Sequence, residues 1–587
     1  MPRSWSSLLL GTLCASGLAS PLPSSTPPPP TVHLPDSDVW FTGTAANQTE
    51  SFRNIRFGQD TSGSNRFAPP QPYVYPAGSV VNATQPGAAC PQQKQPLPDF
   101  PLFDNVTAIS EDCLTLRVDR PAHTSPADRL PVLVFIFGGG DTIGQIYDSA
   151  YDPTLLVAGA AQKAVPVIYV AMNYRVGIFG FASSPALNAS DALNAGLLDQ
   201  RLALWWIQDH IAAFGGDPDR VTLFGESDGA TGVGLQLTAY GGQVDTVPFQ
   251  RAILESGGAS ADTGTAWDAA GQHTAVLIDR VNCTAPTSQA ELECLRRLPM
   301  RTLLHTAYAY EVTLNPMGGM DVFIPVAPST FIPDRPTNLL KAGRFARDID
   351  LIAGWCENDG AFFTPTDLAT SADVAQSLRD SYPRLSNASI AQALQLYPLS
   401  DFANDTTGDP PVSAQFFRAS QMARDQGFTC PSLLTVETNA RYASHGQVAN
   451  YLYALNQTAF AEVLALEGLS YYGVPHFSDI PYIFNTVTDG RLAPVATAAD
   501  RQLASAMGAS WASFATFGDP SHVNGTVPGW SPAFSAGNHS SPGSSTAPKL
   551  RVLGGPDARL TGRGYHEKLV QRCAFWNSDE VTAALGV

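Results

Sequence analysis

One serine in this 587-residue sequence lies in a pattern that supports nucleophilic chemistry. Ser227 is the centre of Gly-Glu-Ser-Asp-Gly, which follows the short apolar run 221–224 and precedes GVGLQLTAY, a sequence that favours a helix. A sharp turn from strand to helix leaves room only for glycine at the flanking positions, Gly225 and Gly229, and it exposes the serine hydroxyl to a substrate carbonyl. Because chance matches are common in a chain with 49 glycines, the prediction depends on the partners of the serine.

A carboxylate partner is expected after a later strand. The apolar run 349–356 predicts that strand, and ENDGAFF follows it, with Glu357 and Asp359 as its acidic residues. The carboxyl ends of parallel strands meet at one edge of a sheet, so either carboxylate can face Ser227. From the residues alone, both are candidates.

A histidine completes the set. The run 447–455 predicts another strand, and the loop YYGVPHFSDIPYIF after it carries His476. The other histidines beyond Asp359 precede that strand, lie in polar loops or belong to a terminal helix. The order serine, acid, histidine is typical of enzymes with this strand–turn–helix nucleophile. His476 is therefore the predicted base that takes the proton of Ser227.

Three consecutive glycines follow the apolar run Leu130 to Phe137. That run has the unbroken apolar character of a strand buried on both faces. A plain tight turn needs one or two glycines, whereas Gly138, Gly139 and Gly140 together let bare backbone N–H groups turn toward a negatively charged oxygen. The sequence therefore predicts an oxyanion-binding loop here.

These residues require a scaffold that brings several strand ends together. Between the glycines and Ser227 the sequence predicts a strand at 165–174 and a long amphipathic helix that starts near Asn194 and ends at Gly215. Strands and helices thus alternate along the chain. This alternation predicts an α/β fold with a doubly wound, mostly parallel sheet.

The composition excludes several classes of function. The formal net charge is -18, and no basic stripe is present that could displace counterions from phosphates, so nucleic-acid binding is not expected. No close Cys and His residues have the spacing of metal ligands, and no motif calls for a cofactor, so neither a metal nor a cofactor is predicted.

The N-terminus has the pattern of a secretory signal. Arg3 precedes an apolar run from Leu8 to Leu18, and the small residues Ala19 and Ser20 follow it, which predicts a signal peptide at residues 1–20. The run is too short to cross a bilayer, and no later stretch is long and apolar enough to do so. We therefore expect a Pro- and Ser-rich extended lead-in at 21–36 and a soluble, secreted protein.

Glycosylation and disulfides agree with secretion. Ten Asn-x-Ser/Thr sites predict glycans at Asn47, Asn82, Asn105, Asn188, Asn282, Asn387, Asn404, Asn456, Asn524 and Asn538. The mature chain keeps seven cysteines, so at least one is unpaired. Cys90 with Cys113 and Cys283 with Cys294 are neighbours in sequence, and Cys356, Cys430 and Cys573 compete for one further bond.

These segments together resemble the type-B carboxylesterase and cholinesterase family of α/β-hydrolases. The resemblance runs from about Gly43 to Trp576, and it is carried by FGGDPDRVTLFGESDG, EDCLTLRVDRP, NYRVGIFGF, GLLDQRLAL, FGDP and CAFWN. It implies one catalytic domain at 37–587 with a large, mostly parallel central sheet, flanking helices and loop insertions that form a substrate gorge. It also implies a serine carboxylesterase that forms an acyl-enzyme on Ser227 and needs no cofactor.

The resemblance also assigns individual residues. The acid is the residue before the glycine of ENDG, which is Asp359; the family more often has Glu there, so Glu357 remains a reserve candidate. The oxyanion hole is formed by Gly139, Gly140 and the backbone N–H of Asp228. Two further implications are an ion pair of Arg175 with Asp199 and a free Cys356. The implied disulfides are Cys90 to Cys113, Cys283 to Cys294 and Cys430 to Cys573.

Two residues depart from the family pattern. Asp228 stands where a small residue normally follows the nucleophile, and Asp141 stands where an aromatic or small residue follows the three glycines. The Asp228 carboxylate would repel the developing oxyanion, so it must be protonated, turned onto a partner, or used to bind a polar or cationic substrate group beside Asp141. Our hypothesis is the last of these, a substrate-binding role.

The resemblance leaves the ester substrate, small-molecule or lipid, open. The loop between Cys90 and Cys113 has no Trp to hold a choline ammonium, so choline esters are not favoured. A lipase or sterol esterase is the alternative, although the Pro-rich loop does not have the amphipathic helix expected of a lid. A catalytically weak binding protein on the same fold is the alternative from another class.

Overall fold

The structure, a computed structural model, describes residues 28–93, 104, 106–243, 247–315, 319–406, 411–443, 448–490, 492–534, 548–555 and 563–587. The predicted signal peptide, residues 1–20, lies outside these residues, as do most of the predicted lead-in and the sequons at Asn105 and Asn538.

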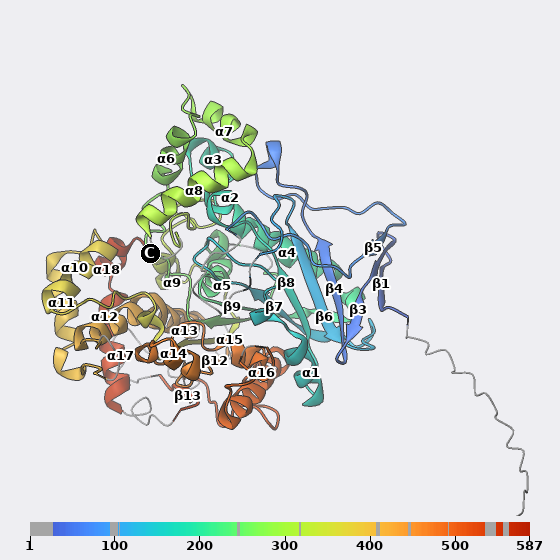
Figure 1. Cartoon of the computed structure of the whole chain (residues 1–587). Coiled ribbons are helices and arrows are strands. Elements are labelled where there is room, and N and C mark those ends of the chain that lie inside the picture. Colours follow the sequence, from blue (N-terminus) through green and yellow to red (C-terminus); the bar gives the residue numbers. More distant parts are fainter. Residues whose placement is uncertain are drawn as a thin grey trace, which may run out of the picture.

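A ten-stranded sheet forms the centre of the molecule (Figure 1). Seven neighbouring strands are parallel. In sheet order they are β13 (Arg551–Leu553), β12 (Asn450–Leu455), β11 (Asp350–Cys356), β10 (Arg251–Glu255), β9 (Gly216–Glu226), β7 (Leu130–Ile136) and β8 (Ile168–Met172). Three antiparallel strands extend the β8 edge, namely β6 (Thr115–Pro121), β4 (Thr49–Arg56) and β3 (Thr44–Ala46). The predicted α/β fold with a mostly parallel sheet is confirmed.

The central strands are apolar because helices cover both faces of the sheet. All residues of β8 and all but the first residue of β7 are buried. Helix α16 (Ala498–Phe517) packs with α1 (Thr154–Gln162) on one face, and α4 (Ala195–His210) packs with α5 (Asp228–Thr238) on the other (Figure 1). A short 3-10 turn prolongs α4 to Phe214, and Gly215 ends it with φ 90°, as the C-cap prediction requires.

The N-terminal end of the chain differs from the predicted lead-in. Residues Thr31–Leu34 form β1, which pairs antiparallel with β2 (Val39–Thr42) in a separate three-stranded sheet with β5 (Val80–Asn82). Val32 and Leu34 alternate toward the core and are almost fully buried. The end of the stretch 21–36 is therefore a paired strand, because this alternation lets it bury two apolar side chains.

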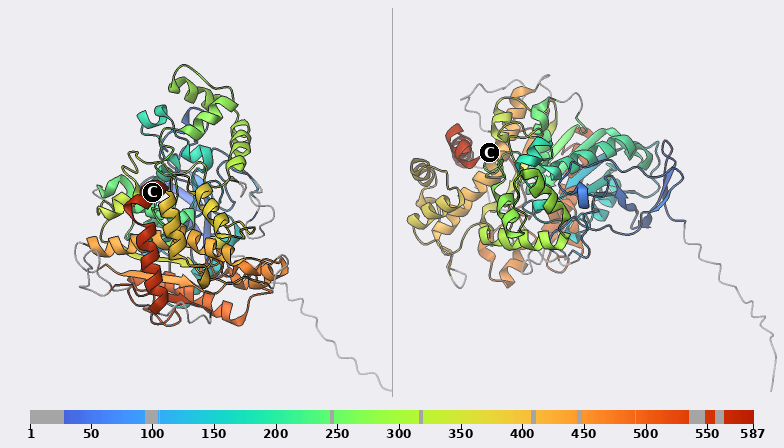
Figure 2. Two further views of the ribbon diagram at one scale, coloured as in Figure 1. Left: turned by 90° about the vertical axis from the view of Figure 1, so that its left-hand side faces the viewer. Right: turned by 90° about the horizontal axis from the view of Figure 1, so that it is seen from above.

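A helical layer projects from one side of the sheet. Helices α6 (Gln272–Arg280), α7 (Ser288–Arg297) and α8 (Met300–Leu314) lie with α3 (Pro185–Ala189) at the top of Figure 1, and the green helices α6 to α8 are also at the top of the left-hand view of Figure 2. A second apolar core lies beneath them and includes Leu277, Leu292 and Leu303. Beyond α8, Asp321 donates its backbone N–H to the carbonyl of Gly140 at 3.0 Å and lines the same cavity as Ser227.

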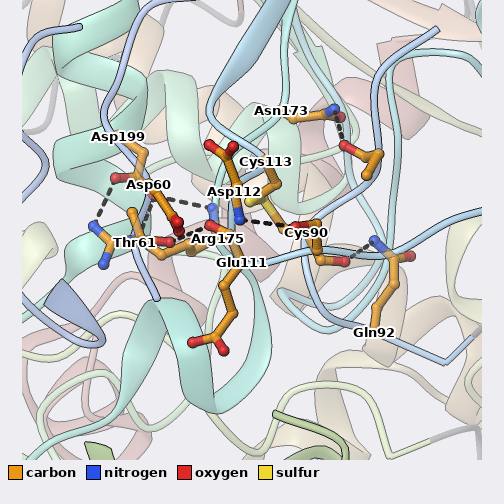
Figure 3. Close-up of a disulfide and its surroundings, with 12 residues drawn as sticks. Asp60, Thr61, Cys90, Gln92, Glu111, Asp112, Cys113, Asn173, Arg175 and Asp199 are labelled. Carbon is orange, nitrogen blue, oxygen red and sulfur yellow. Dashed lines mark hydrogen bonds and ion pairs between the residues drawn. A yellow bond between two sulfur atoms is a disulfide. The ribbon is translucent and has the colours of Figure 1, made fainter. Parts of the chain in front are cut away.

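Two short-range disulfides staple loops. Cys90 to Cys113 and Cys283 to Cys294 have Cα–Cα distances of 5.0 and 5.5 Å. Beside the first, Gln92 donates from its amide to the carbonyl of Gly144 (2.7 Å) and accepts from the same residue's N–H (2.9 Å). The stapled loop is therefore tied to the segment that follows the three glycines. Figure 3 shows this disulfide and its surroundings.

The ion pair implied by the family lies nearby and is confirmed. Two guanidinium nitrogens of Arg175 lie 2.7 Å from the carboxylate oxygens of Asp199, and both side chains are buried. Arg175 and Asp199 are both drawn as sticks in Figure 3.

A long-range disulfide joins Cys430, at the start of α13 (Cys430–Tyr442), to Cys573 in α17 (Arg563–Trp576). It closes a loop of 143 residues, which stabilises the fold by about 5 kcal/mol in the chain-entropy model. Cys356 is free and fully buried at the end of β11. The three disulfides and the free cysteine of the structure are those that the resemblance implied.

Seven of the described sequon asparagines are exposed: Asn47, Asn82, Asn188, Asn282, Asn387, Asn404 and Asn524. Asn456 differs, because its side-chain nitrogen is buried. A glycan at Asn456 would therefore require local rearrangement. Within the described part of the chain, no helix has the length and apolarity needed to cross a membrane.

Candidate active site

The turn around Ser227 is the predicted strand, turn and helix. Ser227 has φ 59° and ψ −128° between the end of β9 and the start of α5. A Cβ on Gly225 would lie 2.6 Å from the backbone of Gly229, and a Cβ on Gly229 would lie 2.1 Å from the carbonyl oxygen of Ile136. Both positions therefore require glycine, and the close packing keeps the serine in its strained conformation.

Ser227, His476 and Asp359 form a continuous line of hydrogen bonds. Nε2 of His476 lies 2.8 Å from Oγ of Ser227, and Nδ1 lies 2.8 Å from Oδ1 of Asp359. The other carboxylate oxygen of Asp359 accepts from the backbone N–H of Cys356 at 2.8 Å and from the hydroxyl of Ser256 at 2.9 Å. These bonds hold the buried carboxylate in one orientation, which also orients the imidazole ring.

Glu357, the reserve candidate, faces a different partner. Its carboxylate lies 3.2 Å from a guanidinium nitrogen of Arg424. Between the two acids, Asn358 accepts a hydrogen bond from the N–H of Val474 and donates its own N–H to the carbonyl of the same residue. This pairing of the two loops brings His476 beside Asp359.

Glu226 is a site residue that the sequence reasoning missed. Its buried carboxylate lies 3.2 Å from Nε2 of His476. Burial raises the pKa of Glu226 well above its ordinary value. Burial alone would lower the pKa of His476, but the carboxylates of Glu226 and Asp359 outweigh it and raise that pKa to about 9. Glu226 therefore stabilises the imidazolium form of His476. Its position next to Ser227 in the sequence was the available signal.

One of the backbone N–H groups predicted to bind the oxyanion, in the glycine loop after β7, already has a hydrogen-bond partner. The N–H of Gly140 donates to the carboxylate of Asp228, and the same carboxylate oxygen lies 3.4 Å from Oγ of Ser227. Gly139 and Gly140 have φ of 122° and 62°, which favour glycine. Of the three states expected for Asp228, the structure contains the one turned onto a partner, and that partner is a predicted oxyanion donor.

Further carboxylates surround Asp228. Oxygens of Asp141, Asp228 and Asp262 all lie within 4.8 Å of one another, and Asp321 lies nearby. Burial, reinforced by the neighbouring carboxylates, raises the pKa of Asp141 and Asp262 well above the usual range and that of Asp321 to about 7. Sequence reasoning singled out Asp141 and missed Asp262 and Asp321, which come from distant loops.

A cavity of about 240 Å³ opens beside Ser227. Its apolar wall includes Ile143, Met320, Ile324, Phe362, Phe363 and Phe428. The ring of Phe428 packs on the His476 ring at a centroid distance of 4.7 Å, and Phe363 packs on it at 5.3 Å. The cavity therefore offers an apolar group room next to a serine hydroxyl whose proton has an acceptor, which is the arrangement needed for attack on a carbonyl.

Comparison with known proteins identifies the family of the chain. The model of the carboxylesterase family matches residues 40–547. The chain belongs to the carboxylesterase family. It is a carboxylic ester hydrolase, and its fold is the α/β-hydrolase fold.

Individual family members differ in their described activity. The chain is 40% identical to the inactive carboxylesterase-like protein VdtD of Byssochlamys spectabilis, over 84% of each chain. It is 36% identical to a secreted lipase of Arthroderma benhamiae, over 92% of this chain and 93% of that one. The crystal structure of EstA from Aspergillus niger aligns with a TM-score of 0.74 at 26% identity, over 95% of this chain and 99% of that chain.

Proposed function

We propose that the protein is a secreted serine carboxylesterase in which Ser227, His476 and Asp359 form the catalytic triad. Oγ of Ser227 attacks the ester carbonyl carbon while its proton passes to Nε2 of His476. Asp359 orients the ring and stabilises the imidazolium. The imidazolium then gives its proton to the departing alcohol, and water attacks the acyl-enzyme by the same route. The unbroken hydrogen-bonded line from Ser227 to Asp359 is the observation that carries this proposal.

The oxyanion is held by backbone N–H groups of Gly139, Gly140 and Asp228 in this proposal. Because the Asp228 carboxylate accepts the N–H of Gly140, a substrate oxygen has to displace it or share the donor. The reaction therefore proceeds best when the Asp228 carboxylate is withdrawn or neutralised.

Secretion is supported by three observations. The N-terminal sequence has the pattern of a signal peptide, the structure has three disulfides, and several relatives are named secreted lipases. Purification from culture medium, followed by N-terminal sequencing, tests this part, and a mature chain that starts near residue 21 is expected.

A fluorophosphonate probe and a panel of soluble esters test the enzymatic proposal. Peptide mapping should find the probe on Ser227, and short and medium acyl esters should be hydrolysed. Labelling without hydrolysis would contradict the assigned substrate class, and no labelling of Ser227 would contradict the mechanism.

Lipid esters are the second candidate substrates, because several relatives are named lipases. A rate that rises sharply once a triglyceride exceeds its solubility would favour this candidate. A rate that saturates below the solubility limit would favour soluble esters.

Asp228→Ala should raise kcat for small neutral esters by roughly a hundredfold. A carboxylate about 6 Å from the developing oxyanion repels it by about 3 kcal/mol at an effective dielectric of about 20, and that energy corresponds to about a factor of 100 in rate. The substitution also frees the N–H of Gly140. Steady-state kinetics without added divalent ions measure the effect, and Asp219→Asn, at an exposed carboxylate near the start of β9, is the control. An unchanged or lower kcat would show that the Asp228 carboxylate does not oppose the reaction.

Glu226→Gln should move the acid limb of kcat/KM to lower pH by on the order of one pH unit. His476 must be neutral to accept the proton of Ser227, so activity increases as pH rises through the His476 pKa. The Glu226 carboxylate raises that pKa. The uncharged side-chain amide of the Glu226→Gln variant does not raise the pKa of His476, so the imidazole ring loses its proton at lower pH. The pH–rate profile with a soluble ester measures the shift.

Glu255→Gln is the matched control for Glu226→Gln. Glu255 is equally buried on the neighbouring strand, but its carboxylate accepts from the indole N–H of Trp511 at 2.6 Å. Its replacement should leave the acid limb in place. Equal shifts in the two variants would mean that Glu226 has no specific effect on His476.

A further inference from the structure

Three aspartates from separate segments point their carboxylates at one position next to the proposed oxyanion hole. Asp141 follows the glycine loop, Asp228 begins α5, and Asp262 lies in the segment after β10. Their carboxylate oxygens lie within 4.8 Å of one another. Like charges this close repel strongly, so the arrangement needs a balancing positive charge or protons.

Asp141 has a carboxylate oxygen that accepts no hydrogen bond from the described residues. The residue is only 5% exposed, and its Oδ2 is buried without a hydrogen-bond partner. Oδ2 of Asp262 is buried and unpartnered as well, while its other oxygen accepts from the hydroxyl of Thr231 at 3.2 Å. Leaving a buried carboxylate oxygen without a partner is costly. The two open acceptors therefore point to a ligand that the protein itself does not supply.

Among the described residues that line the cavity, none is Lys or Arg, whereas Asp228, Asp262 and Asp321 are all part of that lining. His476 lines the cavity as well, but its two ring nitrogens are hydrogen-bonded to Ser227 and Asp359. A positive charge between Asp141, Asp228 and Asp262 therefore has to come from outside the chain.

The ligand set favours a metal ion over a substrate ammonium group. Asp228 and Asp262 line the cavity, but Asp141 does not, so a substituent on an ester in the cavity would not reach all three carboxylates. A single ion bound between the three carboxylates contacts all of them. Carboxylate oxygens are the ligands that Ca²⁺ and Mg²⁺ prefer.

The coordination preferences of the two ions favour Ca²⁺. The three oxygens lie within 4.8 Å of one another, so all three can lie within roughly 2.8 Å of one point, which admits the Ca²⁺–oxygen distance of about 2.3–2.6 Å. Ca²⁺ accepts irregular sets of carboxylates, whereas Mg²⁺ demands near-octahedral geometry and keeps several of its water ligands.

We propose that Asp141, Asp228 and Asp262 bind a Ca²⁺ ion, and that the ion activates ester hydrolysis by neutralising the Asp228 carboxylate at the oxyanion hole. Without the ion, the negative Asp228 carboxylate holds the N–H of Gly140 and repels the developing oxyanion. With the ion, that repulsion is cancelled. The claim that the ion activates hydrolysis rests on the proposed esterase function, whereas the claim that the three aspartates bind Ca²⁺ does not.

Calorimetric titration of the full-length protein, treated with EDTA and then dialysed, tests the binding. CaCl₂ should bind with one ion per chain and a Kd of roughly 10⁻⁵–10⁻³ M, and MgCl₂ should bind more weakly. Asp141→Asn and Asp262→Asn, which keep the shape of the side chain, should each weaken Ca²⁺ binding at least tenfold. Asp219→Asn, at an exposed carboxylate, is the matched control and should bind Ca²⁺ as the unmodified chain does.

Thermal unfolding provides a second binding measurement that also reports whether the variants fold. Ca²⁺ should raise the Tm of the unmodified chain and of Asp219→Asn, because an ion that binds only the folded state stabilises it. At the same Ca²⁺ concentration it should raise the Tm of Asp141→Asn and Asp262→Asn by clearly less. No Ca²⁺ binding up to 10 mM, or binding that survives both substitutions, would overturn the proposal.

Hydrolysis rates then distinguish a failure of the proposed Ca²⁺ site from a failure of the proposed esterase function. Ca²⁺ should increase kcat of the unmodified chain by up to roughly a hundredfold, and it should have no effect on Asp228→Ala. Ca²⁺ binding without hydrolysis under any condition would contradict the proposed function and leave the site standing. Binding without a change in kcat would overturn the activation. If Ca²⁺ does not bind and esters with an amino group are preferred, the occupant is a substrate ammonium and the metal proposal is wrong.

Discussion

Ser227→Ala should lower kcat for ester hydrolysis by roughly 10⁴-fold or more. Without the hydroxyl, His476 has no proton to accept and no acyl-enzyme can form, so only binding and the oxyanion donors remain to accelerate the reaction. His476→Ala should have nearly the same effect, and the double variant should lose little more, because the two residues act as one unit. Initial-rate kinetics with a chromogenic soluble ester measure all three.

The control for these variants is His522→Ala, at an exposed histidine in a loop. It should keep full activity, and all variants should share one unfolding temperature within a few degrees. A Ser227→Ala protein that retains a substantial rate would reassign the nucleophile. Loss of activity together with loss of folding would be uninformative for the nucleophile, so fluorophosphonate labelling of the His522→Ala protein at Ser227 provides the independent check.

Asp359→Asn should reduce kcat by about 10⁴-fold, whereas Glu357→Gln should change it by less than about threefold. The amide would present an N–H where Asp359 now accepts from Nδ1 of His476, and it would stabilise the wrong form of the ring. Glu357 interacts with Arg424 instead and lies outside this line of hydrogen bonds. The pair is well matched, because the two acids are separated by one residue and each substitution removes one charge.

The same kinetic assay compares the two acid variants. A reversal, with Glu357→Gln severe and Asp359→Asn mild, would transfer the acid role to Glu357. Equal and moderate losses would instead indicate that the whole turn from 357 to 359 has moved, which a lower unfolding temperature in both variants would reveal.

The fold and the identity of the central residues were predictable because they depend on local patterns. Apolar runs are required wherever helices cover both faces of a parallel sheet, and these runs located β7, β8, β11 and β12 to within three residues at each end. Strand β9 begins at Gly216, five residues before the predicted run 221–224. Gly225 and Gly229 are required by atoms 2.6 and 2.1 Å from the position of a Cβ, so the sharp turn is visible in the sequence as well. From these elements and the residue order, Ser227, Asp359 and His476 could be selected, and their catalytic roles remain predictions.

Tertiary structure alone decided how the charges around Ser227 are arranged. Two acids separated by one residue would share a face in a strand, but the chain turns after β11, so Asp359 meets His476 while Glu357 meets Arg424. The direction of the Asp228 side chain could not be predicted from the sequence either, because its partner Gly140 is 88 residues away.

The cluster of aspartates around Asp228 was even less predictable from the sequence. Asp262 and Asp321 have no local pattern that links them to Ser227, and they reach Asp228 only because separate loops converge at one end of the sheet. Sequence determines which local conformations and which chemical groups are available, because propensity and periodicity act over a few residues. The distances between groups from different loops, and with them the pKa values and the candidate cation site, follow only from the packing of the whole chain.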